Sequence, residues 1–215
     1  MPGTVGMTEV APRAGPGELL PLFVKLEGRR VVVVGGGPVA ASKIGALLDA
    51  GADVEVVAPE IVAEIERAAV TIVRRPFEPD DLAEAWLVVA AAPPDVNRAV
   101  AAAAEPRRVL VNAVDDPGNA SACLGGVVRR EGVTLAISTS GDAPGLTALL
   151  RQALDALLPD DLGTWVEEAQ RRRAEWKRDG APMAERRPLL LEALNALYRR
   201  DDRAASTLAG NSGDA

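Results

Sequence analysis

Histidine is absent from this chain of 215 residues, and cysteine occurs once, as Cys123. Histidine is the commonest metal ligand and general base in enzymes, so its absence excludes the usual zinc sites and catalysis by an imidazole. Proton transfer must therefore fall to carboxylates, lysine, tyrosine or water. A single cysteine cannot form an internal disulfide. Without a histidine to activate it, Cys123 is predicted to be a small buried hydrophobic residue rather than a nucleophile.

Aromatic residues make up only 3% of the chain, whereas hydrophobic residues make up 48%. A core is thus expected, and Val, Leu, Ile and Ala must build it. The formal net charge of −7 argues against a general nucleic-acid binder. No hydrophobic run reaches transmembrane length, because prolines and charged residues interrupt the alanine-rich stretch 83–104. Residues 1–17 lack the apolar segment of a signal peptide, so we expect a cytoplasmic protein with no membrane partner.

Strand and helix signals alternate along the first half of the chain. Strands are predicted at 30–34, 53–58, 70–74, 86–91 and 108–112, and helices at 39–50, 60–68, 79–84 and 95–104. This rhythm is typical of a parallel sheet with helices on both faces, so the predicted fold class is α/β, with a Rossmann-type sheet. Ligands of such sheets bind at the carboxyl ends of the strands.

The rhythm changes after residue 120. Two strands are predicted around the turn Arg130-Glu131-Gly132, then a helix at about 144–158 and helical sequence from Thr164 to about Arg200 with a break near 180–182. An isolated hairpin is marginally stable and needs a partner surface, which favours a homodimer. The predicted domains are a Rossmann domain at 18–120, a small α+β dimerisation domain at 121–158 and a helical domain at 159–200, between disordered tails at 1–17 and 201–215.

A run of four valines leads directly into glycines at residues 31–37. With the helix that follows, it fits the dinucleotide-binding turn G-x-G-x-x-A, in which Gly35 permits the tight turn, Gly37 lets backbone N–H groups approach a pyrophosphate and Ala40 keeps the helix close to the strand. The helix N-terminus offers free N–H groups and a partial positive charge to the phosphates. The alternative is a tight strand-to-helix turn that uses glycine for structure alone.

The second strand ends in Ala58-Pro59-Glu60, with no aspartate at its end. Glu60 is the nearest candidate for the ribose hydroxyls, slightly later than the usual position. No arginine follows directly to receive a 2′-phosphate, so NAD is favoured over NADP as the cofactor.

Two polar loops follow later strands. Asp115 and Asp116 come after the fifth strand, where the nicotinamide end of the cofactor is expected, and a paired or desolvated carboxylate can act as an acid or base near neutral pH. The alternative is a turn that these residues cap, since Asp-Pro is a common turn pair. Residues 138–141 could bind a substrate carboxylate with the next helix N-terminus, or they could simply cap that helix.

Several motifs occur in order along the chain. They are Leu20-Pro21-Leu22-Phe23, the glycine turn with Lys43, Val56-Val57-Ala58-Pro59, Val96-Asn97, residues 112–117, residues 137–141 with Pro144, and Leu149-Leu150-Arg151. Together they resemble the precorrin-2 dehydrogenase/sirohydrochlorin ferrochelatase family, the N-terminal half of bifunctional siroheme synthases, in its stand-alone form. The resemblance covers roughly residues 18–200.

The resemblance implies NAD-dependent oxidation of the tetrapyrrole precorrin-2, with Fe²⁺ insertion as a further activity in some members, and a homodimer. It implies NAD contacts at Pro38, Val39, Pro59 and Glu60, to which we add Asn97. It also implies a catalytic aspartate at Asp115. The substrate carries many carboxylates although the protein is net acidic, so a local basic patch is required, for which Lys43, Arg129, Arg130 and Arg151 are the candidates.

An alternative function is an NAD-sensing regulatory module that binds the cofactor without chemistry. This alternative explains the glycine turn and the absence of histidine. It gives no reason for Asp115-Asp116 or for the helical C-terminal part.

Overall fold

The structure is a computed structural model, which describes residues 19–140 and 143–210. The chain divides into two compact units, residues 1–122 and residues 123–215. The predicted disordered tail at 1–17 and Gly141 lie outside the described residues.

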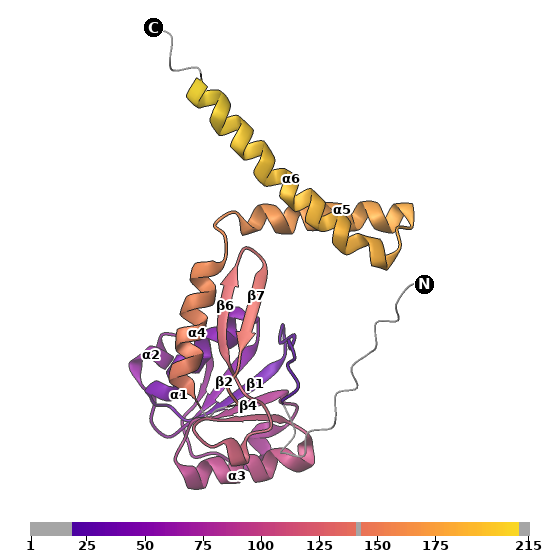
Figure 1. Ribbon diagram of the computed structural model, residues 1–215. Coiled ribbons are helices and arrows are strands. Elements are labelled where there is room, and N and C mark those ends of the chain that lie inside the picture. Colours follow the sequence, from indigo (N-terminus) through magenta and orange to yellow (C-terminus); the bar gives the residue numbers. More distant parts are fainter. Residues whose placement is uncertain (1–18, 141–142, 211–215) are drawn as a thin grey trace. The chain divides into compact units, whose positions relative to one another are not determined.

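The first unit is built on a parallel sheet of five strands in the order β3-β2-β1-β4-β5 (Figure 1). The strands are β1 (Arg30–Val34), β2 (Asp53–Val57), β3 (Thr71–Val73), β4 (Leu87–Ala90) and β5 (Leu110–Ala113). The helices are α1 (Pro38–Asp49), α2 (Ala63–Glu66) and α3 (Pro94–Ala104), with short 3-10 turns η1 (Pro79–Leu82), η2 (Glu105–Arg107) and η3 (Pro117–Asn119). The predicted α/β fold class with a Rossmann-type parallel sheet is confirmed.

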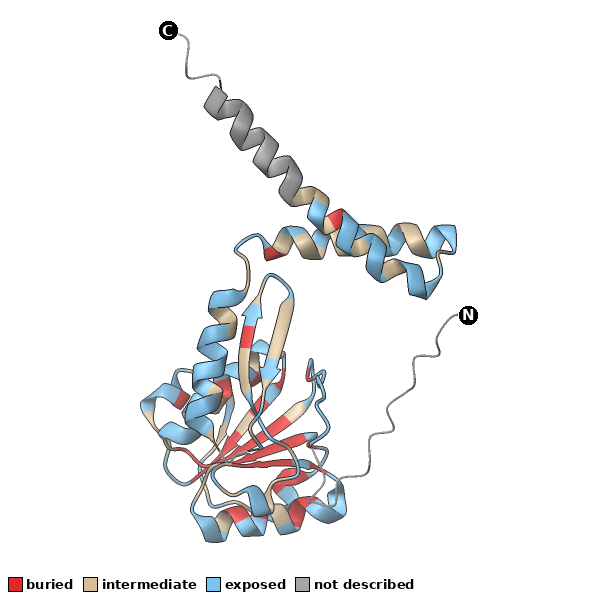
Figure 2. Ribbon diagram, viewed as in Figure 1, coloured by how far each residue is buried: buried red, intermediate tan, exposed pale blue. Residues whose placement is uncertain are grey.

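The valine run of β1 is buried on both faces of the sheet. Val31 and Val33 pack with Ile44 and Leu47 of α1, whereas the alternate residues of β1 pack with Val100 and other residues of the α3 side. Successive side chains of a strand point to opposite faces, so only a strand that is apolar at every position can be covered on both. The buried residues accordingly gather in the sheet (Figure 2), in a core of Val, Leu, Ile and Ala, as the composition requires.

Two predicted helices of this unit differ from the structure. The prediction of an α-helix at 79–84 was wrong, because the segment forms the 3-10 turn η1 and Glu84 adopts a positive φ of 58°. The carboxylate of Asp81 accepts a hydrogen bond from the Glu78 N–H at 2.8 Å, which closes a tight turn instead of a longer helix. The helix predicted at 60–68 is shortened to α2.

The second unit contains the hairpin strands β6 (Gly126–Arg130) and β7 (Val133–Ile137), then α4 (Pro144–Leu157), α5 (Leu162–Asp179) and α6 (Met183–Gly210). The turn residues Glu131 and Gly132 have φ values of 45° and 80°, as a two-residue hairpin turn requires. Gly180 ends α5 in the left-handed conformation. Within the described residues, the buried hydrophobic side chains of this unit are Val128, Leu162 and Ala193.

Two further sequence predictions for this unit differ from the structure. Helix α6 continues to Gly210, although a disordered tail was predicted from residue 201, because alanine, arginine and leucine in this stretch favour a helix. The prediction that Cys123 is buried was wrong, because the residue is exposed in the segment before β6. No helix of the described part of the chain is long and apolar enough to cross a membrane.

Candidate active site

The first two glycines of the turn after β1 are required by close backbone packing. Gly35 has a φ of 123°, and a Cβ atom there would lie 2.2 Å from the carbonyl oxygen of Ala91. A Cβ atom at Gly36 would lie 1.9 Å from the carbonyl oxygen of Glu60. No side chain fits at either position without moving the backbone of the loop after β4 or the loop after β2. Both glycines therefore bring the three strand-end loops together.

Gly37 differs from its two neighbours. It is the N-cap residue of α1 in an extended conformation, with φ −88° and ψ −177°, and no atom lies within 4 Å of the place that its Cβ would take. The fold does not require glycine there, but the space that it leaves lies at the start of a helix of 12 residues. The N–H groups of Val39 and Ala40 belong to the first turn, which leaves them without acceptors inside the helix. This cradle fits the pyrophosphate of a dinucleotide.

The remaining members of the turn fit the same description. Ala40 is fully buried against the sheet, which keeps α1 close to β1, whereas Pro38 and Val39 are exposed. Pro38 occupies the first helical position, where the missing N–H costs nothing. The exposed side chains are free to meet a ligand, and the buried one fixes the helix.

Pro59 and Glu60 lie beside the glycine turn. The N–H of Val62 donates a hydrogen bond to the carbonyl oxygen of Gly36 at 2.9 Å, which holds the loop after β2 against the turn. Pro59 and Glu60 are both exposed. The structure thus brings the predicted ribose ligand Glu60 next to the predicted phosphate cradle.

Asn97 is buried at the start of α3, and its side chain has a structural partner. The Oδ1 atom accepts a hydrogen bond from the N–H of Ala92 at 3.0 Å, which fixes the loop after β4. This loop faces the glycine turn, because the N–H of Ala91 donates to the carbonyl oxygen of Val34 at 2.8 Å. The structure gives Asn97 a positioning role, and a direct cofactor contact by Asn97 stays a prediction.

The adjacent aspartates after β5 have different surroundings. Asp116 accepts a hydrogen bond from the Asn119 side-chain amide at 2.7 Å, so its carboxylate is engaged within the turn. Asp115 is exposed, has a φ of 55°, and no hydrogen bond or ion pair within the described residues engages its carboxylate. A left-handed backbone at a residue other than glycine is uncommon and costs free energy, and such residues cluster at functional sites.

The loop that carries Asp115 is fixed from both sides. The N–H of Val114 donates to the carbonyl oxygen of Ala90 at 3.0 Å, which ties the loop to the end of β4. On the other side, the buried Asn112 side chain donates to the carbonyl oxygen of Ala122 at 3.0 Å, and the Ser121 hydroxyl accepts from the Val111 N–H at 2.8 Å. The sequence analysis did not identify these two anchors, although an asparagine inside a buried strand was a visible signal.

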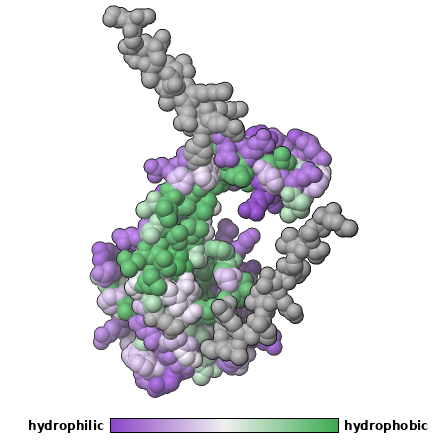
Figure 3. Space-filling model, in the orientation of Figure 1, coloured by the Kyte–Doolittle hydropathy of each residue, from purple (hydrophilic) through white to green (hydrophobic). Residues whose placement is uncertain are grey.

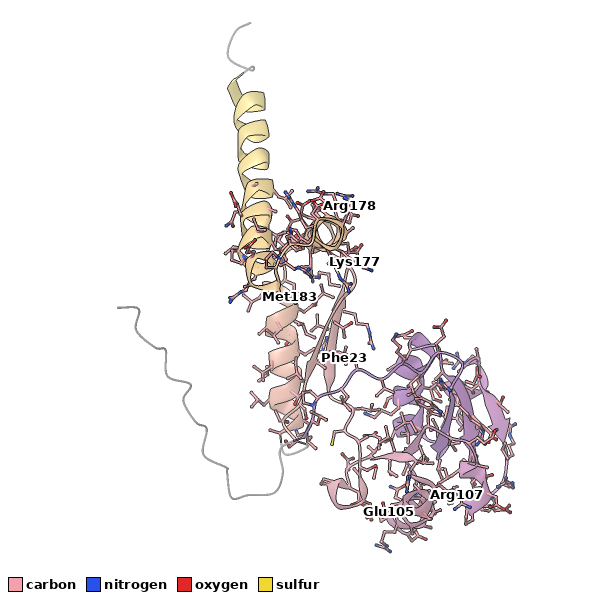
Figure 4. The ribbon with its side chains drawn as sticks, turned by 90° about the vertical axis from the view of Figure 1, so that its right-hand side faces the viewer. Phe23, Glu105, Arg107, Lys177, Arg178 and Met183 are labelled. Carbon is pink, nitrogen blue, oxygen red and sulfur yellow. The ribbon has the colours of Figure 1, made fainter. Side chains whose placement is uncertain are left out.

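The predicted basic residues differ in their surroundings. Arg130 is engaged within the second unit, because its guanidinium donates to the carbonyl oxygen of Leu158 at 2.7 Å and to Asp155 at 3.1 Å, so a substrate contact by Arg130 stays a prediction. Arg129 and Arg151 are exposed, as are Lys177 and Arg178 at the end of α5 (Figure 4). In the first unit, Lys43 of α1 is half-buried.

The loop before α4 is tied to that helix through the side chain of Thr139. The Thr139 hydroxyl accepts a hydrogen bond from the N–H of Ala143, the N-cap residue of α4, at 3.3 Å, and lies 2.9 Å from the Thr147 hydroxyl. Thr139 thus ties the loop to the start of α4, and binding of a substrate carboxylate by residues 138–141 stays a prediction. Within the described ranges, no group of three or more Cys, Asp or Glu residues could hold a metal ion.

Comparisons with known proteins agree with this geometry. Residues 22–126 match the family model described as "Putative NAD(P)-binding". The chain is 39% identical over 186 residues to the siroheme synthase of Photorhabdus laumondii, covering 84% of this chain and 40% of that protein. It is 43% identical over 175 residues to siroheme synthase 1 of Yersinia enterocolitica, covering 79% of this chain and 37% of that protein.

The solved structure named "SirC, precorrin-2 dehydrogenase" superimposes with a TM-score of 0.61 at 25% identity, covering 81% of this chain and 88% of that chain. These findings confirm the predicted resemblance to the precorrin-2 dehydrogenase and siroheme synthase family, and they confirm a dinucleotide-binding domain. The chain spans about two fifths of the length of the siroheme synthases that it matches.

Proposed function

We propose that this chain is an NAD-dependent precorrin-2 dehydrogenase, which oxidises precorrin-2 to sirohydrochlorin in siroheme biosynthesis. The observation that carries the proposal is the exposed carboxylate of Asp115, held in a left-handed backbone at the same edge of the sheet as the glycine turn. The names of the similar proteins support the substrate, since one is a precorrin-2 dehydrogenase and others are siroheme synthases.

The chemistry requires that a hydride and a proton leave the reduced tetrapyrrole. Bound NAD⁺ supplies the hydride acceptor. The carboxylate of Asp115 accepts the proton, since the chain has no histidine and Asp116 is engaged within its turn. The N–H groups after Gly37 hold the pyrophosphate, and Glu60 accepts hydrogen bonds from the ribose hydroxyls.

The substrate's acetate and propionate groups need cations. Within the second unit, the exposed guanidinium groups of Arg129 and Arg151 are candidates to bind carboxylates, because neither has an ion-pair partner within the described residues. Insertion of Fe²⁺ as a second substrate, which the resemblance implies for some members, stays a prediction for this chain, as does a cytoplasmic location.

The test is incubation of the purified chain with precorrin-2 and NAD⁺, followed by NADH absorbance, with and without Fe²⁺. NADH formation at the rate of sirohydrochlorin appearance is the expected result. A chain that binds NAD⁺ and forms no NADH would instead support the alternative, a regulatory module without chemistry. A change in the absorbance of sirohydrochlorin that depends on Fe²⁺ would support the chelatase activity separately.

We also propose a homodimer formed through α4. Its residues Leu146, Leu149, Leu150 and Leu157 recur at helical spacing and are 40–77% exposed. The other side of α4 packs on the hairpin, where Thr147 lies against Gly126. Figure 3 shows the resulting hydrophobic surface along this helix. A second copy with the same stripe would cover it by two-fold symmetry.

A further inference from the structure

The end of β3 lies beside the end of β2, where the adenosine ribose of a dinucleotide is expected. Val57 pairs with Val73, and the N–H of Ala58 donates to the carbonyl oxygen of Val73 at 3.1 Å. The next residue, Arg74, therefore follows at the same edge of the sheet as Ala58-Pro59-Glu60. The arginine that is missing directly after β2 is thus present on the neighbouring strand.

Arg74 is held by a carboxylate. Its guanidinium forms an ion pair with Glu66, the last residue of α2, and both side chains are about half exposed. The neighbouring Arg75 is unavailable, because it binds both carboxylate oxygens of Asp81 and the carbonyl oxygen of Pro76. Of these two neighbouring arginines, Arg74 is therefore the one that a single exposed carboxylate holds.

We propose that Glu66 sets the preference of this site for NAD over NADP by holding Arg74 away from the ribose 2′ position. NADP carries a 2′-phosphate with nearly two negative charges, and a guanidinium can bind such a group through paired hydrogen bonds. While Arg74 is bound to Glu66, its charge is offset by the carboxylate and its Nη2 group is engaged. The inference rests on the cofactor site of the proposed function, the turn at residues 35–40.

Glu60 acts in the same direction by a different route. Its backbone carbonyl lies beside Gly36 of the glycine turn, and its exposed carboxylate can accept hydrogen bonds from free ribose hydroxyls but repels a phosphate. Selectivity against NADP thus has two contributions. Glu60 repels the 2′-phosphate, and Glu66 prevents Arg74 from attracting it. The two contributions can be separated, because only the second depends on Arg74.

The size of the expected effect follows from the exposure of the pair. Exposed ion pairs are weak, so Arg74 already leaves Glu66 for part of the time. Replacing Glu66 by glutamine removes the competing charge and keeps the shape of the side chain. We expect NADP⁺ to bind about threefold to fivefold more tightly as a result, whereas the affinity for NAD⁺ stays the same.

The experiment measures the Kd of NAD⁺ and of NADP⁺ by calorimetry on the full chain. The variants are Glu66→Gln, the double variant Glu66→Gln/Arg74→Gln, and Glu64→Gln as a matched control. Glu64 is an exposed carboxylate of the same helix, so its loss removes an equal charge without releasing Arg74. The expected result is a gain in NADP⁺ affinity in Glu66→Gln alone, lost in the double variant and absent in Glu64→Gln.

Two outcomes would overturn the inference while leaving the proposed function intact. One is an unchanged NADP⁺ affinity in a Glu66→Gln protein that binds NAD⁺ normally. The other is a gain that persists without Arg74 or appears equally in Glu64→Gln, since it would then reflect net charge alone. Failure of the unaltered chain to bind NAD⁺ would overturn the cofactor site itself, and this inference with it.

Discussion

At the scale of single residues, Gly37 can be separated from the glycines that precede it. Its backbone conformation suits any residue, and a Cβ atom there would have open space around it. We therefore predict that Gly37→Val folds normally but weakens NAD⁺ binding by about tenfold or more, or about 1.4 kcal/mol, because the valine occupies the place of the pyrophosphate. Calorimetric titration with NAD⁺, together with a thermal melt, measures both properties.

Gly36→Ala is the matched control for this prediction. Its Cβ would overlap the carbonyl oxygen of Glu60, so the melting temperature is expected to fall. Wild-type NAD⁺ affinity in a folded Gly37→Val protein would show that the cofactor does not use this turn.

Asp115 and Asp116 provide the second residue-scale prediction. Asp115→Asn is expected to slow precorrin-2 oxidation by about 10²–10⁴-fold, because the amide cannot accept the proton, and NAD⁺ affinity should stay unchanged. Asparagine tolerates the left-handed backbone of this position, so the loop should keep its conformation. Initial rates of NADH formation provide the measurement.

Asp116→Asn serves as the comparison, since an amide oxygen can still accept the hydrogen bond from Asn119. Its rate is expected to stay near that of the unaltered protein. If Asp115→Asn were fully active and Asp116→Asn inactive, the assignment of the base would be reversed. Full activity of both variants would leave the loop with no part in proton transfer.

At the scale of secondary-structure elements, η1 depends on the buried carboxylate of Asp81. Burial alone would raise the pKa of Asp81, but hydrogen bonds from Arg75 and the Glu78 N–H outweigh it and lower that pKa below its ordinary value of 3.8. A carboxyl group whose pKa is lower in the folded than in the unfolded state stabilises the fold at any pH above the pKa of the unfolded state. This stabilisation is lost as the pH falls through the pKa of the folded state. We therefore predict that the free energy of unfolding decreases below about pH 4.

Asp81→Asn tests this prediction by urea denaturation at pH 7 and near pH 3. At pH 7 the free energy of unfolding of the variant is expected to be about 1–3 kcal/mol lower than that of the unaltered protein, because the hydrogen bonds to a charged group are removed. This difference in free energy should become smaller near pH 3. Asp80→Asn is the control, since Asp80 is exposed and pairs only at the surface with Arg107. If the difference in unfolding free energy between Asp81→Asn and the unaltered protein did not change with pH, the loss of stability in acid would not be due to Asp81.

Much of the first unit could be predicted from the sequence, because every strand is rich in valine or other apolar residues and glycine, proline or aspartate follows shortly after it. The roles of Gly35, Gly37 and Ala40 also follow from residue type. What sequence could not provide depends on contacts between distant residues. Asp116 differs from Asp115 because Asn119 binds it. The loop that carries both aspartates is anchored by Asn112 and Ser121, and Arg74 is restrained by Glu66. Periodicity contains no information about such pairs.

At the scale of the whole molecule, the exposed leucines of α4 require an explanation that one chain does not provide. Helix α4 and the hairpin bury few side chains of their own, and a contiguous apolar stripe of this kind marks an interface. We predict that the chain is a dimer at micromolar concentration and that Leu149→Glu makes it monomeric. The glutamate would place an unpaired charge within the apolar contact, where desolvation is costly.

Light scattering after gel filtration measures the mass, and Ala148→Glu is the matched control. Ala148 is also exposed on α4 but lies away from the leucine stripe, so a glutamate there should leave the dimer intact. Leu149 is 65% exposed in the single chain, so its replacement should not unfold the helix. A circular dichroism spectrum close to that of the unaltered protein would verify this. A monomeric unaltered chain, or equal dissociation by both variants, would mean that the leucine stripe is not the interface. Loss of NADH formation on dissociation, with NAD⁺ binding retained, would further indicate that the tetrapyrrole site needs both copies.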